Sequence, residues 1–239
     1  MRISGNNVKD GTYALGDPRY LGNENPKEIW KHLVNNVRAV GFKGNSWCDV
    51  GCASGAALRY FDSELPLDVL VGVEPSEVLL GEAMKRGPDR ARWMIDGLPN
   101  LDLLEGTTFD AVSCIGVLAL MDDIEKNLSA LSRLVAPGGF LFVLDLINPK
   151  PLDMIMRCRQ SGTENWTMAY NTFSEETYRA VGEGLGFKVS FTPTPMPFPI
   201  AETDDPMVAW TNSVGDNPFT VVSGTGQILM FSLATFTRM

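Results

Sequence analysis

The stretch SWCDVGCASGAAL, residues 46–58, begins as an apolar run and ends as a helical pattern. Between the two lies a loop of small residues, Gly51 to Gly55, of the kind that lets a ligand approach the backbone. The pattern predicts a buried strand that enters a tight turn, followed by a helix whose free N–H groups face the ligand. A nucleotide-like ligand is therefore the first interpretation of this turn.

Strand and helix patterns alternate around this turn. A helix is expected from Asn25-Pro26, an N-cap followed by proline, to Val40. Strands are then expected at 46–51, 69–74, 91–95, 109–116 and 140–145. The intervening helices are expected at about 54–62, 76–86, 99–105 and 122–136, the last ending at Pro137-Gly138-Gly139. Such alternation favours a parallel sheet with helices on both faces.

The last third of the chain has a different pattern. A helix is expected at 175–185 and strands at 187–192 and 227–237, which fit an antiparallel pair closing the sheet. The segment 193–226 between them is too rich in proline for a central strand. We expect one domain over 1–239, with an N-terminal arm at 1–24, a cofactor-binding core at 25–150, and substrate-side insertions and the closing strands at 151–239.

Composition restricts the possible functions. A chain of 239 residues with 44% hydrophobic residues can form one α/β domain with a sizeable core. The net charge of −9, without a run of Lys or Arg, argues against a nucleic-acid partner. No apolar stretch is long enough to span a membrane, and the N-terminus lacks the apolar core of a signal peptide. Four cysteines without metal-ligand spacing indicate reduced thiols in a cytoplasmic protein and no metal: Cys48, Cys52, Cys114 and Cys158.

Acidic residues follow the second and third expected strands. Glu74 lies where a carboxylate at the carboxyl end of a parallel strand can accept ribose hydroxyl protons, although a solvated acid at a helix N-terminus is the alternative. Asp96-Gly97 could receive the amine of an adenine, with Leu98 packed on the ring, and an ordinary Asp-Gly turn is the alternative. After the fourth strand, small and apolar residues reach the same edge: Cys114, Ile115 and Gly116.

These motifs together resemble those of a known family. The series DVGCASG (49–55), VGVEPS (71–76), DGLP (96–99), FDAVSCIGVL (109–118) and LVAPGGFLFVLD (134–145) resembles the successive motifs of class I S-adenosylmethionine-dependent methyltransferases. The resemblance covers about residues 30–150. It implies a Rossmann-like, doubly wound, mostly parallel seven-stranded sheet with an antiparallel last strand, and S-adenosyl-L-methionine as the cofactor.

The resemblance also implies the cofactor-binding residues. Asp49 and the loop that follows it would surround the methionine part, Glu74 would hold the ribose, and Asp96 the adenine amine. Tyr20, with Tyr13 and Arg19, could close over the cofactor as a lid, or belong to a disordered tail. The expected binding set is Asp49, Gly51, Cys52, Ala53, Gly55, Glu74, Pro75, Asp96, Gly97, Leu98, Cys114, Ile115, Gly116 and Tyr20.

Two departures from the family pattern affect the prediction. Many members carry a histidine shortly after the fourth strand, where this chain reads Leu-Ala-Leu-Met at 118–121. Cys52 and Ala53 stand where glycine is more usual, which is tolerated if the backbone angles there are ordinary.

Methyl transfer depends mainly on placing the nucleophile in line with the methyl group, although a hydroxyl nucleophile usually needs a base. His32, the one histidine in the chain, is expected to be an exposed bystander on the first helix. Asp145, at the end of the fifth strand, is the candidate base, with Asn148 as an orienting group. A purely structural role for Asp145 is the equally open alternative.

The acceptor is expected to be a small molecule. Aromatic, methionine and acidic residues of 193–226 could hold a sugar, a cationic amine or an apolar ring, and a weak similarity to methyltransferases of surface-glycan synthesis favours a sugar or glycan precursor. A methyltransferase-like protein without catalysis, acting as a binding partner, stays open, and so does a homodimer. A nicotinamide dehydrogenase is disfavoured because positions 51, 53 and 56 read Gly, Ala and Ala rather than three glycines. Methylation of RNA or DNA is disfavoured by the acidic charge and by the lack of an Asn/Asp-Pro-Pro-aromatic motif.

Overall fold

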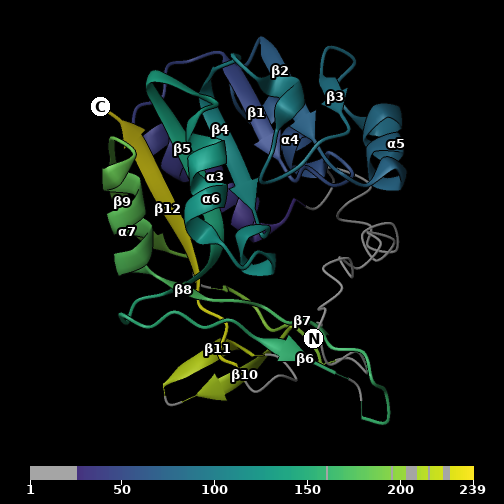
Figure 1. Cartoon of the computed structure of the whole chain (residues 1–239), viewed down its shortest axis with the longest axis vertical. Coiled ribbons are helices and arrows are strands. Elements are labelled where there is room, and N and C mark those ends of the chain that lie inside the picture. Colours follow the sequence, from purple (N-terminus) through teal and green to yellow (C-terminus); the bar gives the residue numbers. More distant parts are fainter. Residues whose placement is uncertain (1–25, 160, 195, 203–208, 215, 223–226) are drawn as a thin grey trace.

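A mixed sheet forms the centre of the computed structural model, which describes residues 26–239 apart from 160, 195, 203–208, 215 and 223–226 (Figure 1). Its strand order is β3-β2-β1-β4-β5-β12-β9, and β8 pairs with β5 off this path. The strands are β1 (Ser46–Val50), β2 (Val69–Val73), β3 (Arg92–Met94), β4 (Phe109–Ile115), β5 (Val135–Asn148), β8 (Phe173–Ser174), β9 (Phe187–Pro193) and β12 (Phe231–Arg238).

Strands β1 to β5 are mutually parallel, whereas β12 is antiparallel to both β5 and β9. The predicted doubly wound, mostly parallel sheet with an antiparallel last strand is therefore confirmed. The sheet has eight strands rather than seven because the short β8 pairs in parallel with Ile147 and Asn148 at the end of β5.

Helices cover both faces of the sheet. α3 (Glu28–Ala39) and α4 (Ala56–Glu64) pack on one face, where Trp47 of β1 stacks on Phe142 of β5 at 5.7 Å between ring centroids. α6 (Ile124–Ser132) and α7 (Glu175–Gly184) pack on the other face, and α5 (Glu77–Arg86) contacts β3. Two short 3₁₀ helices, η1 (Asp102–Leu104) and η2 (Leu118–Leu120), precede and follow β4. A core of this kind on each face fixes the sheet as the rigid base of the molecule.

The predicted boundary between the helix at 122–136 and the strand after it is wrong. The helix expected at 122–136 ends at Ser132, and Pro137-Gly138-Gly139 lies inside β5, which begins at Val135. The pairing of β4 with β5 shifts register between Phe109 and Ala111, Gly138 has φ +73°, and a Cβ on Gly139 would lie 2.8 Å from the carbonyl oxygen of Asp110. The three residues therefore form a bulge that needs glycine, rather than a helix stop.

The insertions form two small antiparallel hairpins that the sequence pattern did not predict. β6 (Arg157–Cys158) pairs with β7 (Thr167–Met168), and β10 (Trp210–Val214) pairs with β11 (Asn217–Val222). Both hairpins lie at the carboxyl end of the parallel strands, below the sheet in Figure 1, while β12 runs back to the C-terminus at the top. The last strand starts at Phe231, not at the predicted 227.

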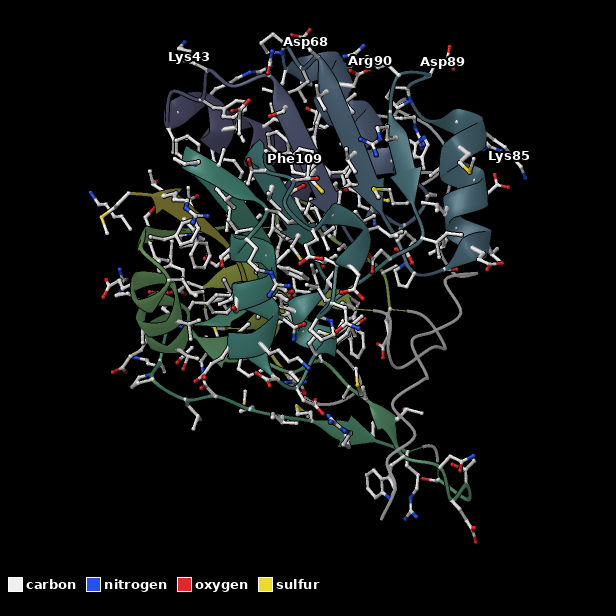
Figure 2. The ribbon with its side chains drawn as sticks, turned by 45° about the horizontal axis from the view of Figure 1, so that its top comes forward. Lys43, Asp68, Lys85, Asp89, Arg90 and Phe109 are labelled. Carbon is white, nitrogen blue, oxygen red and sulfur yellow. The ribbon has the colours of Figure 1, made fainter. Side chains whose placement is uncertain are left out.

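The opposite end of the molecule carries charged residues. Figure 2 shows Lys43, Asp68, Asp89 and Arg90 at the top, far from the β6–β7 hairpin at the bottom. Arg90 there pairs with Asp62. None of the described helices has the length and apolar character needed to cross a membrane.

Candidate functional site

The loop that joins β1 to α4 is tied to the neighbouring strand. The N–H groups of Gly51 and Cys52 donate to the carbonyl oxygen of Val73, at 2.8 and 3.0 Å. Gly51 has φ +80°, and a Cβ there would lie 2.4 Å from Cγ2 of Val117. Gly55 has φ +71°, and a Cβ there would meet the indole of Trp93 at 2.6 Å. Both glycines are therefore required by backbone conformation and by close packing.

Ala53 differs from the expectation of an ordinary backbone. Its φ is +48°, in the left-handed region that a residue with a Cβ rarely adopts. The neighbouring Cys52 does not have a positive φ, but its side chain is buried against Gly72 and not turned toward the edge. Cys52 can therefore contribute its backbone, and not its thiol, to a ligand.

Asp49 at the end of β1 belongs to a buried hydrogen-bond chain. The indole Nε1–H of Trp47 donates to Ser113 Oγ at 2.8 Å, so the hydroxyl proton of Ser113 is directed to Asp49 Oδ1 at 2.5 Å. Asp49 is 2% exposed, and this burial raises its pKa to about 7. The hydrogen bond from Ser113 lowers the pKa, and the nearby Glu74 carboxylate raises it by a smaller amount. No local pattern marks the role of Ser113, because this role depends on the β1–β4 register that places Ser113 beside Asp49.

Glu74 is buried at the end of β2, which excludes the solvated-acid interpretation. Its Oε2 accepts the N–H of Ala53 at 3.0 Å, and its Oε1 accepts the N–H of Ser76 at 2.9 Å. Burial raises the pKa of this carboxyl, and the two backbone hydrogen bonds oppose the rise. The structure therefore brings Glu74 and the loop after β1 together, as the motif predicted.

The Asp96 carboxylate holds its own loop. Oδ1 accepts the N–H of Gly97 at 2.7 Å, and Oδ2 accepts the N–H of Leu103 at the start of η1 at 2.9 Å. Asp96 therefore forms the Asp-Gly turn that was the alternative interpretation. Its carboxylate is half-buried and still has lone pairs that can accept a hydrogen bond from a ligand. Pro75 packs 3.4 Å from the position of a Cβ on Gly97, so the loops after β2 and β3 are in contact.

Apolar groups lie beside these acids. Ile95 is 52% exposed at the end of β3, and Leu98 and Ile115 are half-buried. Gly116 is exposed, with nothing within 4 Å of its Cβ position. In contrast, the Cys114 side chain is fully buried in the core under α6 and α7, and its place in the binding set stays a prediction.

Asp145 holds a loop in the interior. It is 1% exposed, its Oδ2 accepts the N–H of Ala119 in η2 at 3.1 Å, and its Oδ1 accepts the N–H of Leu146 at 2.8 Å. Burial raises its pKa to about 6, against the hydrogen bonds from backbone N–H groups. These contacts favour the structural alternative for Asp145, and its role as the base stays a prediction.

Two other residues lie in surroundings that the sequence did not indicate. Asn148 accepts the N–H of Lys150 and donates to the carbonyl oxygen of Leu152, so its side chain shapes a turn. His32 is half-buried rather than exposed, its Nε2 is buried without a partner among the described residues, and burial lowers its pKa. The lid residues Tyr13, Arg19 and Tyr20 lie outside the described residues.

A cluster that fastens the β6–β7 insertion to the loop after β4 was missed. Asn171 is fully buried; its Oδ1 accepts the N–H of Met156, and its Nδ2 donates to Asp122 and to the carbonyl oxygen of Met121. Arg157 pairs with Asp122. No local pattern marks these residues, since the partners are up to 50 positions apart.

The residues at this edge fit S-adenosylmethionine. Glu74 lies against the loop after β1, and Asp49 lies at the start of that loop. The exposed Gly116, which follows β4, leaves room for a ligand to approach the backbone. Together they suit the cationic and hydroxyl-bearing parts of such a ligand. The half-exposed Ile95 and Ile115 offer apolar surface for a ring. Within the described part of the chain, no group of three His, Cys, Asp or Glu side chains could hold a metal.

Comparisons with known proteins agree with this geometry. Residues 23–190 match a family described as "Methyltransferase domain", and the chain belongs to this family. The family predicted from the motifs is thereby confirmed, and the nicotinamide dehydrogenase is not retained.

Curated relatives are more distant. A ubiquinone biosynthesis O-methyltransferase of Coxiella burnetii is 25% identical over 119 residues, 46% of this chain and 50% of the relative. An uncharacterised protein of Synechococcus is 30% identical over 100 residues, 40% of this chain and 24% of the relative. The chain thus spans half or less of the length of these curated relatives.

Solved structures share the fold over nearly the whole chain. An amino pentose methyltransferase from Micromonospora echinaspora with bound S-adenosylmethionine has a TM-score of 0.58 at 18% identity, covering 95% of this chain and 94% of the other. A magnesium protoporphyrin IX methyltransferase from Synechocystis has the same TM-score at 15% identity, and the match covers 97% of this chain and 98% of the other.

Proposed function

We propose that this protein transfers a methyl group from S-adenosyl-L-methionine to a small-molecule acceptor. The observation that carries the proposal is Glu74, which is buried at the end of β2 with one oxygen on the N–H of Ala53. This contact holds a carboxylate against the loop after Asp49, where a ribose and an amino acid moiety can both be bound.

The residues have distinct roles in the proposed reaction. Glu74 binds ribose hydroxyls, Asp49 faces the methionine part, and Ile95, Leu98 and Ile115 enclose the adenine. When bound, the cofactor supplies a methyl group whose carbon–sulfur bond breaks with its electron pair left on sulfur, while an acceptor lone pair forms the new bond and any acceptor proton passes to water. The protein's contribution is placement of the acceptor in line, which can supply much of the rate.

The structural alternative for Asp145 favours particular acceptor atoms. If this carboxylate, which accepts the N–H groups of Ala119 and Leu146, serves only to hold its loop, the acceptor must react without a base from Asp145. An amine that is neutral, or a hydroxyl acidic enough to ionise by itself, needs no such base. Acceptors of the similar proteins, which by name concern ubiquinone, an amino pentose and a protoporphyrin, are consistent with a small molecule.

Calorimetric titration with S-adenosylhomocysteine, with NADH as a control, tests the proposal. We expect binding of S-adenosylhomocysteine in the micromolar range or tighter and no binding of NADH. Glu74→Gln should weaken S-adenosylhomocysteine binding by about tenfold or more, since a charge-assisted hydrogen bond contributes roughly 1.5–3 kcal/mol. Glu77→Gln, the same change at an exposed position in the first turn of α5, is the matched control and should leave affinity unchanged.

A methyltransferase-like binding protein without catalysis is the second candidate, favoured by the enclosed Asp145. It predicts tight S-adenosylhomocysteine binding but no transfer of labelled methyl to any amine, phenol or sugar in an acceptor screen. Unchanged affinity in Glu74→Gln would instead remove the ribose assignment itself.

A further inference from the structure

A cavity of about 340 Å³ lies between the first turn of α3 and the insertion that carries β10 and β11. This volume is at the lower end of the range for small-molecule sites. The insertion side of the cavity is apolar and is formed by Met196, Phe198, Ile200, Ala209 and Val221, with Phe231 from β12.

The inner wall of the cavity adjoins the proposed methyl-transfer edge. Phe231 pairs with Leu146 at the carboxyl end of β5, and it packs on a hydrophobic cluster that contains Leu146, Val221 and Ala119. Ala119 belongs to η2, the turn that follows β4 and the exposed Gly116. A molecule in the cavity therefore lies on the same edge of the sheet as the proposed cofactor site.

The charged residues of the cavity, Lys27, Glu28 and Lys31, all lie at its α3 end. Lys31 Nζ lies 2.6 Å from Glu28 Oε1, and Lys27 Nζ lies 5.6 Å from the ring centroid of Trp30. Ile29 is the apolar contribution of this turn. Sugar hydroxyl groups that face the apolar wall of the insertion would find no partner there, at a cost of about 1–3 kcal/mol each. An apolar ring would gain about 25 cal/mol for each Å² removed from water.

We infer that the acceptor is an apolar aromatic compound with one nucleophilic heteroatom, a phenol or an arylamine, bound in this cavity. The inference rests on the proposed function and replaces the sugar expected from the sequence. The ring packs against Ile29 and Phe198, and the heteroatom points toward the proposed cofactor site. Its lone pair forms the bond to the methyl carbon, the sulfonium becomes a neutral thioether, and the heteroatom's proton passes to water.

The test uses the full chain and two probes, 1-naphthol as the apolar ring and UDP-glucose as the nucleotide sugar. Calorimetry measures binding of each in the presence of S-adenosylhomocysteine, and transfer of labelled methyl from S-adenosylmethionine is measured with each as acceptor. We expect 1-naphthol to bind and UDP-glucose not to bind. Ala209→Trp, which fills the cavity, should weaken 1-naphthol binding by about tenfold or more.

Controls separate this inference from misfolding and from the proposed function. Ala39→Trp, the same change at an exposed position in the last turn of α3, should bind 1-naphthol as the wild type does. Phe198→Ala removes a cavity wall that is 41% exposed, so it should fold normally and also weaken 1-naphthol binding. Both cavity variants should bind S-adenosylhomocysteine normally.

Two results would overturn the inference: equal 1-naphthol affinity in wild type, Ala209→Trp and Phe198→Ala, or binding and methylation of UDP-glucose in place of 1-naphthol. Failure of the wild type to bind S-adenosylhomocysteine would overturn the proposed function instead. In that case, loss of 1-naphthol binding in Ala209→Trp would still support an apolar ligand site in the cavity.

Discussion

At the scale of single residues, Ser113 shows how a hydroxyl on one strand can set the state of a carboxylate on the next. It accepts from Trp47 and donates to Asp49, and all three side chains are buried. Because the Ser113 hydroxyl accepts one hydrogen bond and donates the other, the protons of this hydrogen-bond chain can be arranged in only one way. We therefore regard Ser113 as a positioning residue for Asp49.

Ser113→Ala should lower the free energy of unfolding by about 2 kcal/mol, because it leaves the Trp47 indole N–H and the Asp49 carboxyl without their partner. Ser232→Ala is the matched control, since Ser232 is also buried in the sheet but its Oγ has no partner within the described chain. Urea unfolding followed by tryptophan fluorescence measures both. Equal losses in the two variants would contradict the role given to Ser113.

Ala53 is a second residue at which a single change is informative. A left-handed conformation costs a residue with a Cβ roughly 1 kcal/mol, and glycine avoids that cost while losing more entropy on folding. Ala53→Gly should therefore be neutral or stabilising by up to about 1 kcal/mol. Ala180→Gly, in the exposed middle of α7, should destabilise by about 1 kcal/mol. Thermal unfolding measures both variants. If Ala53→Gly lowers stability as much as Ala180→Gly does, the backbone at Ala53 is not strained.

At the scale of elements, the insertion between β5 and β8 is held to the loop after β4 by a few buried polar contacts. Asn171 satisfies backbone groups of Met156 and Met121, and its own N–H donates to the carbonyl oxygen of Ala119. Ala119 in turn donates to Asp145. The β6–β7 hairpin, η2 and β5 are thereby linked at the edge where the acceptor is proposed to bind.

Asn171→Ala should lower the free energy of unfolding by about 2–3 kcal/mol, because it leaves buried backbone groups unpaired. It should also speed hydrogen exchange at Met156 and in the β6–β7 hairpin more than in β1 or β4. Asn212→Ala, at an exposed position of β10, is the control and should change neither. Uniform exchange across the sheet and the hairpin would show that Asn171 does not fasten the insertion in particular.

At the scale of the whole molecule, stability should depend on pH through its buried acids. Asp49 has a pKa raised from 3.8 to about 7, so between pH 4 and 7 the folded state binds more protons than the unfolded state. Its contribution is therefore full below pH 4 and is lost as the pH rises through 7. Asp145, raised to about 6, acts in the same direction, whereas the lowered pKa values of Asp110 and Asp153 stabilise the fold above pH 4.

Asp49→Asn should raise the free energy of unfolding at pH 8 by up to about 4 kcal/mol, because burial raises the pKa of Asp49 from 3.8 to about 7 and the substitution removes the cost of ionising it. At pH 4 the same change should have little effect, because Asp49 is then protonated in the folded state and only about half ionised in the unfolded state. Asp89→Asn, at an exposed position, is the control. Urea unfolding at both pH values measures the difference, and an Asp49→Asn gain that is the same at pH 4 and pH 8 would contradict the raised pKa.

The amino-acid sequence by itself determined the order of strands and helices, the parallel core and the motifs of the family, including Gly51 and Glu74. These follow from local periodicity and turn chemistry, which are set by residues close together in the chain. The tertiary structure decided the Ser113–Asp49 contact, the enclosure of Asp145, the burial of Asn171 and the apolar cavity against α3. Those features depend on burial and hydrogen bonds between residues tens of positions apart, and a carboxylate becomes a base or a structural acid according to what packs over it.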